Sequence, residues 1–339
     1  MKRVNLRDVA ARAGVSVSTV SMALRGKVTV RATTERVRAL AEEMGYRPNP
    51  ILASLASKRF RSPSAVNGVP LAIYRFPYVL KEPEERPSYH VDLMAEARIL
   101  GYAPRVYDLT NASNPKTLFR DLHHRMVQGI VITGSMDEHF AAEFDWEPFS
   151  VVQCGRFQTV HSFHTVRPNI FQAVKLAFTQ LRLGGYSRIG FAMGQHDQPL
   201  EDDEARYGAA IALEGKYLPR KDRLPVYTGP IHDREAFLQW YDRWKPAAVV
   251  GFTNLYYWYL KDHGVQIPKQ VSFVGLHADR GEDGLYSGLY QNFPKISQQA
   301  ILLLDQMIRN HECGRAADPL HILVPSTWDD GKSFKRIKK

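Results

Sequence analysis

The first 45 residues place apolar side chains at helical spacing over short stretches. In the first stretch they recur every three or four positions, which predicts one buried face of a helix. These residues are Leu6, Val9, Ala10 and Ala13. Asn5 can cap the start of this helix, and Gly14 stands where a left-handed residue ends a helix at least cost.

A second helical segment follows this glycine directly. Ser16 can cap it, and the segment extends to about residue 24. Its inward residues are Val20, Ala23 and Leu24, and its outward residues are Val17, Ser18, Ser21, Met22 and Arg25. The outward side chains are small, polar or long and include no acid, so this face suits the major groove of DNA. The pattern predicts a helix–turn–helix; a helical hairpin packed on an enzyme is the alternative that periodicity alone leaves open.

Two further helices are expected before residue 61. One runs from about Thr34 to Met44, with Val37, Leu40 and Ala41 turned inward, and stops before Gly45. The other covers residues 49–60, NPILASLASKRF, and is too short to be stable alone. We therefore expect it to fold against DNA and a partner helix. Residues 62–68 have the composition of a linker.

From Val69 onward the pattern changes to apolar strands that alternate with amphipathic helices. We expect strands at 69–76, 104–109, 129–134, 149–155, 188–194, 247–253 and 271–276. We expect helices at 89–101, 115–126, 170–186 and 295–310, and another between the last two strands. Repeated βα units predict parallel sheets wrapped by helices, and the length of this part indicates two lobes. Ligands of such sheets bind at the carboxyl ends of the strands.

The distribution of charge separates the N-terminal part from the rest. The chain of 339 residues carries a net charge of +10, and residues 1–62 hold 13 Lys and Arg against four acids. The remainder is nearly neutral, so the basic charge lies in the small helical part, as in proteins that bind polyanions. A solvated basic arm is the alternative.

Other classes of protein find little support in the sequence. No run of about 18 apolar residues predicts a membrane span, and the N-terminus lacks the apolar region of a signal peptide. We expect no cofactor or metal, because Cys154 and Cys313 have no partner at ligand spacing. The pair His123–His124 and the acids EDDE at 201–204 are expected to be solvated, and DDGKS at 329–333 lacks the first glycine of a phosphate loop. No nucleophile–base pair is apparent, so we expect no enzyme.

The segment VNLRDVAARAGVSVSTVSMAL, together with GYRPN and a leucine six residues after that asparagine, resembles the LacI/GalR family of bacterial transcription regulators. The resemblance implies an all-α helix–turn–helix headpiece, a hinge helix and an α/β two-lobed core like that of periplasmic binding proteins, with parallel sheets. It places Leu55 where the family inserts a leucine into the minor groove, a wedge that kinks a flexible base step. The DNA-binding residues that follow from pattern and resemblance are Asn5, Leu6, Ser16, Val17, Ser18, Thr19, Ser21, Met22, Arg25, Asn49, Leu52 and Leu55.

The core resembles the family more loosely. EARYGAAIAL places Arg206 where the family holds sugar hydroxyls, and its guanidinium fork suits that role. The effector-binding residues implied by the resemblance are Tyr74, Phe76, Arg206, Asn254, His277 and Phe293. The chain departs from the family at Met22, where Arg is usual, and at Arg31, where a capping Ser is usual. It also departs at Pro168, His277 and Ala278, which replace acids. The effector is therefore expected to be atypical, or the core no longer binds one.

The boundaries that follow are a headpiece at 1–48, a hinge helix at 49–61, a linker at 62–68 and a core at 69–328. Lobe 1 covers about 69–165 and 294–320, and lobe 2 covers about 166–293 and 321–328. Residues 329–339 form a basic tail that we expect to be disordered.

The function predicted from the sequence is that of a cytoplasmic, nucleoid-associated transcription regulator. It is expected to repress by binding a pseudo-palindromic double-stranded DNA operator as a homodimer, and to respond to a sugar-like effector. A periplasmic-type sugar-binding protein with a basic arm, or a sugar-processing enzyme, is the alternative. Steep loss of DNA affinity with salt separates the regulator from both.

Overall fold

The computed structural model describes most of the chain beyond residue 67 and part of the N-terminal region. The described residues are 6–16, 19–20, 23, 31–44, 68–75, 89–109, 114–134, 136, 138–155, 163–196, 200–277 and 284–337. The Cα positions divide the chain into a small unit, Met1–Val66 with Arg309–His311, and a large unit, Asn67–Ile308 with Glu312–Lys339.

The small unit has a core of small apolar side chains. Helices α1 (Leu6–Ala13) and α3 (Arg31–Glu43) pack against each other. The buried residues are Val9, Ala10, Ala13, Val20, Ala23, Val37 and Ala41, all predicted to face inward. The helix expected from Thr34 begins three residues earlier, at Arg31. Arg36 joins the two helices, because its Nη2 donates a 3.0 Å hydrogen bond to the carbonyl oxygen of Ala13 at the end of α1.

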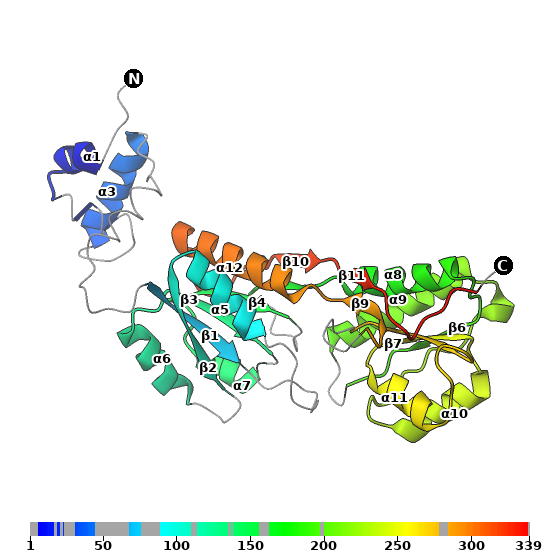
Figure 1. Cartoon of the computed structure of the whole chain (residues 1–339). Coiled ribbons are helices and arrows are strands. Elements are labelled where there is room, and N and C mark those ends of the chain that lie inside the picture. The colour runs from blue at the N-terminus through cyan, green and yellow to red at the C-terminus, as the bar shows by residue number, and fades with distance from the viewer. Residues whose placement is uncertain are drawn as a thin grey trace. The chain divides into compact units, whose positions relative to one another are not determined.

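The large unit contains two sheets, of which sheet A has six parallel strands in the order β10-β5-β4-β3-β1-β2 (Figure 1). The strands are β1 (Val69–Arg75), β2 (Tyr102–Asp108), β3 (Gly129–Thr133), β4 (Ser150–Cys154), β5 (His164–Pro168) and β10 (His321–Val324). Alternate side chains of each strand pack into the two hydrophobic cores on opposite faces of the sheet, since successive residues of a strand point to opposite faces. Leu71 and Ile73 pack with α5 (Tyr89–Ile99) and α12 (Phe293–Asn310), whereas Ala72 and Tyr74 pack with α6 (Pro115–His124) and α7 (Glu138–Glu143).

Helix α12 lies very close to strand β3. A Cβ atom on Gly129 would lie 2.7 Å from Cδ1 of Ile308 and 3.1 Å from Cδ2 of Leu304. A larger residue at this position would force the side chains of Ile308 and Leu304 to shift, so the glycine that opens the predicted strand at 129–134 favours close packing of sheet and helix.

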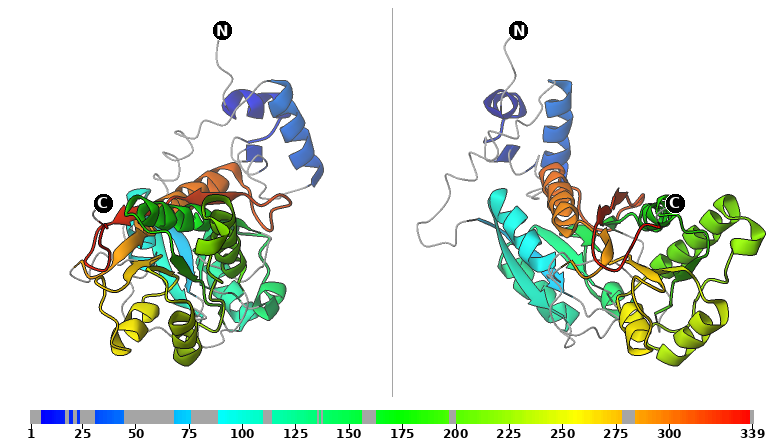
Figure 2. Two further views of the ribbon diagram at one scale, coloured as in Figure 1. Left: turned by 90° about the vertical axis from the view of Figure 1, so that its right-hand side faces the viewer. Right: turned by 45° about the vertical axis from the view of Figure 1, so that its right-hand side comes forward.

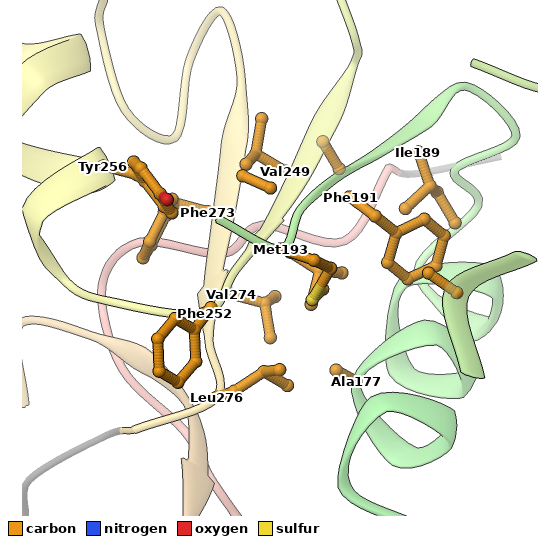
Figure 3. Close-up of a cluster of buried hydrophobic side chains, with 14 of the residues drawn as sticks. Ala177, Ile189, Phe191, Met193, Val249, Phe252, Tyr256, Phe273, Val274 and Leu276 are labelled. Carbon is orange, nitrogen blue, oxygen red and sulfur yellow. The ribbon is translucent and has the colours of Figure 1, made fainter. Parts of the chain in front are cut away.

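Sheet B has five strands in the order β11-β9-β8-β7-β6, parallel except where β11 meets β9. The strands are β6 (Ile189–Ala192), β7 (Ala248–Gly251), β8 (Ser272–Gly275), β9 (Ser287–Tyr290) and β11 (Thr327–Asp329). Helices α8 (Ile170–Leu183) and α9 (Glu201–Tyr217) lie on one face, and α10 (Arg234–Trp244) and α11 (Leu255–Asp262) on the other (Figures 1 and 2). The core between these layers is built from aromatic and β-branched side chains such as Phe191, Val249 and Phe273 (Figure 3).

The chain passes between the two sheets later than the sequence suggests. Residues 164–168 form strand β5 and residues 321–324 form strand β10, and both strands belong to sheet A. The expected passages of the chain from lobe 1 to lobe 2 lie earlier, after residues 165 and 320. The backbone pairing of Thr165 with His321 continues to Pro168 and Val324. The strand β5 mixes polar with apolar residues and β10 has only four residues, so neither is distinct in the sequence, which is why the expected boundaries differ.

The basic tail, expected to be disordered, is instead bound to sheet B as far as residue 337. The Ser333 hydroxyl donates to the Phe273 carbonyl at 2.7 Å and accepts from the Ser287 N–H at 2.8 Å. The Ile337 N–H donates to the Gly184 carbonyl at 2.9 Å. Within this tail Lys332, Lys335 and Arg336 are exposed, whereas Ser333 is buried and Phe334 is half-buried. Within the described ranges, no helix is long and apolar enough to cross a membrane.

A buried carboxyl on α9 makes stability depend on pH. Glu214 is 4 % exposed, and burial raises its pKa to about 7, although Arg223 and the Leu224 N–H act in the opposite direction. A group whose pKa is raised on folding contributes stability below its unfolded pKa of about 4.5, which is lost as the pH rises through 7.

We expect Glu214→Gln to remove this loss. The difference in unfolding free energy between the variant and the native chain should be about 2–3 kcal/mol more favourable to the variant at pH 8 than at pH 5, because one pKa unit is worth about 1.4 kcal/mol. Urea unfolding at both pH values measures the difference, and Glu204→Gln on the exposed side of the same helix is the control. An unchanged pH slope in Glu214→Gln would contradict the assignment.

Candidate effector site and DNA-binding surface

The described part of the helix–turn–helix shows how its second helix begins. The Thr19 N–H donates to the Ser16 hydroxyl at 3.0 Å, and the two hydroxyls lie 2.8 Å apart. Ser16 therefore caps this helix as predicted. Leu6 begins α1. The DNA-binding roles of Leu6, Ser16 and Thr19 stay predictions. So do those of the other predicted residues, which lie outside the described residues: Asn5, Val17, Ser18, Ser21, Met22, Arg25, Asn49, Leu52 and Leu55.

In the large unit, polar and aromatic side chains gather where the parallel strands of sheet B end. His196 follows β6, Phe252 and Asn254 follow β7, His277 follows β8, and Gln291 follows β9. The carboxyl ends of neighbouring parallel strands share one edge of a sheet, which is where α/β sheets bind ligands. Two of the six predicted effector residues, Asn254 and His277, lie on this edge.

Arg206 reaches the same edge from helix α9. Its side chain is 1 % exposed, and its Nη2 donates to the Asp203 carboxylate one turn earlier on the helix. Asp203 also accepts hydrogen bonds from His196 Nδ1 at 2.7 Å and from the backbone N–H groups of His196 and Leu200, both at 3.2 Å. Burial alone would raise the pKa of Asp203, but the hydrogen bonds from His196 and the charge of Arg206 outweigh it and hold the pKa below the usual value.

The ring of Phe252 lies at the centre of this group. The guanidinium carbon of Arg206 is 3.5 Å from the ring centroid, a close cation–π contact. The imidazoles of His196 and His277 meet the same ring edge-on, with centroid distances of 5.4 and 5.2 Å. These contacts define the Arg206 cluster: His196, Asp203, Arg206, Phe252 and His277.

Two amides extend the cluster along the strand ends. Asn254 Nδ2 donates to the His277 carbonyl at 3.0 Å, and Gln291 Nε2 lies 3.1 Å from His277 Nε2. Amides, imidazoles and a guanidinium offer several donors and acceptors in fixed positions, which is the chemistry needed to orient a small polar ligand.

Two other predicted effector residues, Tyr74 and Phe293, belong to strand β1 of sheet A and to the start of α12. Tyr74 is fully buried in sheet A, where its ring packs edge-on against Tyr107 and Phe144, both at 5.9 Å. Burial raises its pKa far above the ordinary value for tyrosine. Phe293 is half-buried at the start of α12, 6.5 Å from the ring of Tyr290. Phe76 lies outside the described residues.

Sequence reasoning missed His196, Asp203, Phe252 and Gln291. The acids at 201–204, expected in a solvated loop, form the first turn of α9, and Asp202 and Asp203 are buried. One signal was available: Asp203 precedes Arg206 by three residues, the spacing at which side chains meet on a helix. Among the residues that the structure describes, no group of three or more His, Cys, Asp or Glu side chains is placed to hold a metal ion.

Residues 5–49 match the family model for bacterial regulatory proteins of the lacI family. The chain is 24 % identical to catabolite control protein A of Priestia megaterium over 294 residues, which cover 82 % of this chain and 83 % of that protein. It is 26 % identical over 328 residues to the HTH-type transcriptional repressor CytR of Escherichia coli K12, with 90 % of each chain covered.

Solved structures show the same fold. The lac repressor dimer bound to operator and anti-inducer aligns with a TM-score of 0.57 and 20 % identity, covering 98 % of this chain and 99 % of that one. The transcriptional regulator CelR in complex with cellobiose aligns with a TM-score of 0.58 and 20 % identity, covering 98 % and 100 %. A periplasmic binding protein/LacI transcriptional regulator from Alkaliphilus metalliredigens covers 78 % of this chain and 98 % of its own, with a TM-score of 0.57 and 18 % identity.

The helix–turn–helix and the two-sheet core define a DNA-binding transcription regulator with a periplasmic-binding-protein-like core. The predicted fold class is confirmed. Residues 5–49 carry the lacI-family headpiece that the N-terminal motif predicted, and the chain as a whole is similar to regulators of the LacI/GalR family.

Asp203 and Arg206 are expected to stabilise the fold as a pair. Asp203→Ala should lower the unfolding free energy by about 3–5 kcal/mol, because it removes the carboxylate from a buried guanidinium. The double variant Asp203→Ala/Arg206→Leu should be more stable than the sum of the two single losses by at least about 1 kcal/mol. Denaturant unfolding of the four proteins completes this cycle. Strict additivity would show that the two side chains do not interact energetically.

Proposed function

We propose that this protein is a repressor that binds a pseudo-palindromic operator as a homodimer and responds to a small effector. The effector, a sugar or a related metabolite, binds at the carboxyl edge of sheet B against the Arg206 cluster. The protein works in the cytoplasm at the nucleoid. The observation that carries the proposal is the buried Arg206 cluster at a ligand-binding edge, in a chain whose residues 5–49 match a lacI headpiece.

The charge distribution supports DNA as the partner. Nine of the ten net positive charges lie within residues 1–62, and phosphate contacts by such side chains supply most of the non-specific affinity for DNA. The relatives support repression and dimers, since one is described as a transcriptional repressor and a structural neighbour as a repressor dimer bound to operator.

The neighbours also support a sugar-like effector. One solved structure with the same fold contains cellobiose, and another contains D-xylulofuranose. In this chain the guanidinium fork of Arg206, the amide of Asn254 and the imidazole of His277 are the groups that orient hydroxyls. Pro168 and His277 stand where the family has acids, so the effector differs from those that need paired carboxylates.

Effector binding changes operator affinity by a coupling free energy of about 1–3 kcal/mol, or roughly 5–150-fold. The hinge segment at 49–61, which lies outside the described residues, carries this coupling. Its Leu55 is the wedge that enters the minor groove at the centre of the operator.

Selection from a random pool of duplexes at near-physiological salt tests the headpiece, the dimer and the hinge together. We expect a two-fold symmetric motif with a central pyrimidine–purine step. On that motif Leu55→Ala should weaken binding roughly 10–100-fold, because the kinked base step loses its wedge, and should leave non-specific affinity unchanged. Equal losses on both kinds of DNA would refute the wedge. Failure to enrich any motif, with or without sugars, would refute the operator.

The effector site is tested by thermal shift against a panel that includes glucose, cellobiose, D-xylose and ribose with their phosphates. We expect at least one compound to raise the melting temperature, since a ligand at 100 times its Kd stabilises the folded state by about 2.7 kcal/mol. Arg206→Lys should abolish that shift and keep operator affinity, because lysine keeps the charge but not the fork. Leu302→Lys, a change on the exposed side of α12, is the control. An undiminished shift in Arg206→Lys would rule out this edge as the effector site.

A further inference from the structure

The first turn of helix α9 carries four successive acids at 201–204. Asp203 belongs to the cluster described above. Glu201 and Asp202 instead form ion pairs with Arg167 on strand β5, whose Nη1 lies 3.0 Å from a carboxylate oxygen of Glu201 and 3.7 Å from one of Asp202. Strand β5 belongs to sheet A, and α9 covers a face of sheet B, so these ion pairs connect the two sheets.

Asp202 is the acid that most needs a cation nearby. Its side chain is 5 % exposed, whereas that of Glu201 is 42 % exposed and is partly hydrated. A buried carboxylate without a partner is strongly destabilising, and the positive end of a helix offsets only part of this cost. Among the residues that the structure describes, Arg167 is the cation paired with Asp202. The guanidinium of Arg167 therefore neutralises a buried charge at the start of α9.

Asp202 also lies one helical turn from Arg206. The two residues are four positions apart, the spacing at which an acid and an arginine meet on a helix. The buried guanidinium of Arg206 packs on the ring of Phe252 at 3.5 Å and donates to Asp203. A second buried acid within reach of this guanidinium competes for it, unless another cation neutralises that acid. Arg167 is placed to do so.

We propose that Arg167 is a positioning residue of the effector site. It neutralises Asp202 and so leaves Arg206 bound to Asp203 and Phe252, at the carboxyl edge of sheet B. This role rests on the proposed function, because the site that Arg167 serves is the proposed effector site. Arg167 acts through Asp202 and not by contact with the effector. Removing Arg167 alone should draw Arg206 towards Asp202, whereas removing the charge of Asp202 as well should leave Arg206 in place.

A thermodynamic cycle tests this arrangement without an effector. Urea unfolding compares the native chain, Arg167→Met, Arg206→Leu and the double variant. We expect Arg206→Leu to raise the unfolding equilibrium constant at least about tenfold more in the Arg167→Met background than in the native chain, because Arg206 is then the cation that balances Asp202. Adding Asp202→Asn to both proteins of that background should abolish the excess. Additive effects in the cycle would overturn the proposal.

Arg125 provides a matched control for this cycle. It forms an ion pair with Asp121 of helix α6, with 2.8 Å between Nε and a carboxylate oxygen. This pair lies on the layer that covers sheet A, away from α9. Arg125→Met should therefore leave the effect of Arg206→Leu unchanged. An excess as large as that in the Arg167→Met background would show a general response to the loss of an arginine, and would also overturn the proposal.

Effector binding separates positioning from a merely structural role. Calorimetric titration uses whichever of glucose, cellobiose, D-xylose and ribose raises the melting temperature of the native chain. Arg167→Met should weaken the Kd at least about tenfold, whereas Asp202→Asn and the double variant Arg167→Met/Asp202→Asn should stay within about threefold of the native value. An ion pair that only stabilised the fold would be broken equally by either single substitution. Equal weakening by Arg167→Met and Asp202→Asn, or no recovery in the double variant, would refute the positioning role.

The two experiments also separate this role from the proposed function. If none of the four sugars binds the native chain, the sugar-binding site loses its support. The unfolding cycle still decides whether Arg167 controls the position of Arg206 through Asp202.

Discussion

The carboxylate of Asp203 is the group on which the candidate site depends. A guanidinium that is almost completely buried needs a hydrogen-bonded acid beside it, because desolvating an uncompensated charge costs several kcal/mol. Asp203 meets this need from within the same helix and also fixes the imidazole of His196. Phe252 then receives Arg206 on its face and the two imidazoles at its edge. Removing the carboxylate would loosen the ring, both histidines and the arginine together.

This arrangement gives the site a different charge pattern from the one that the family resemblance implies. The acid is Asp203 on α9, one helical turn before Arg206. The ends of β5 and β8, where the resemblance implies acids, carry Pro168 and His277. Asp203 already accepts four hydrogen bonds from the protein. A ligand bound at this edge would therefore contact nitrogen donors and amide oxygens rather than a free carboxylate. For this reason the identity of its effector does not follow from the effectors of relatives.

The sequence predicted the elements whose pattern is long and regular. The headpiece core and the amphipathic helix at 293–310 have a clear helical periodicity, and the strands at 129–133 and 150–154 are mostly apolar runs that are buried at every position. The missed elements mix polar with apolar residues, such as β5 (His164–Pro168), have only four residues, such as β10, or begin with polar residues, such as α9 with its four acids. Arg206 was found by resemblance. Asp203 and His196 were not, because their hydrogen bond joins the segment after β6 to the first turn of α9, and composition does not reveal such a contact. The tail was misjudged because its net charge hid the serine and apolar side chains that bind the sheet.

The order in which the sheets are completed along the chain has a consequence for synthesis on the ribosome. Sheet A receives its first five strands by residue 168, but the helix that covers one of its faces comes only at 293–310 and its last strand at 321–324. Ile296, Ala300, Ile301 and Leu304 fill the core on that face. Until they emerge, an apolar surface of Leu71, Ile73, Val131 and Val152 is only partly covered by α5. From the emergence of residue 168 until that of α12, the nascent chain would thus carry an incompletely covered, aggregation-prone sheet, and chaperones would be expected to engage it before sheet B is complete.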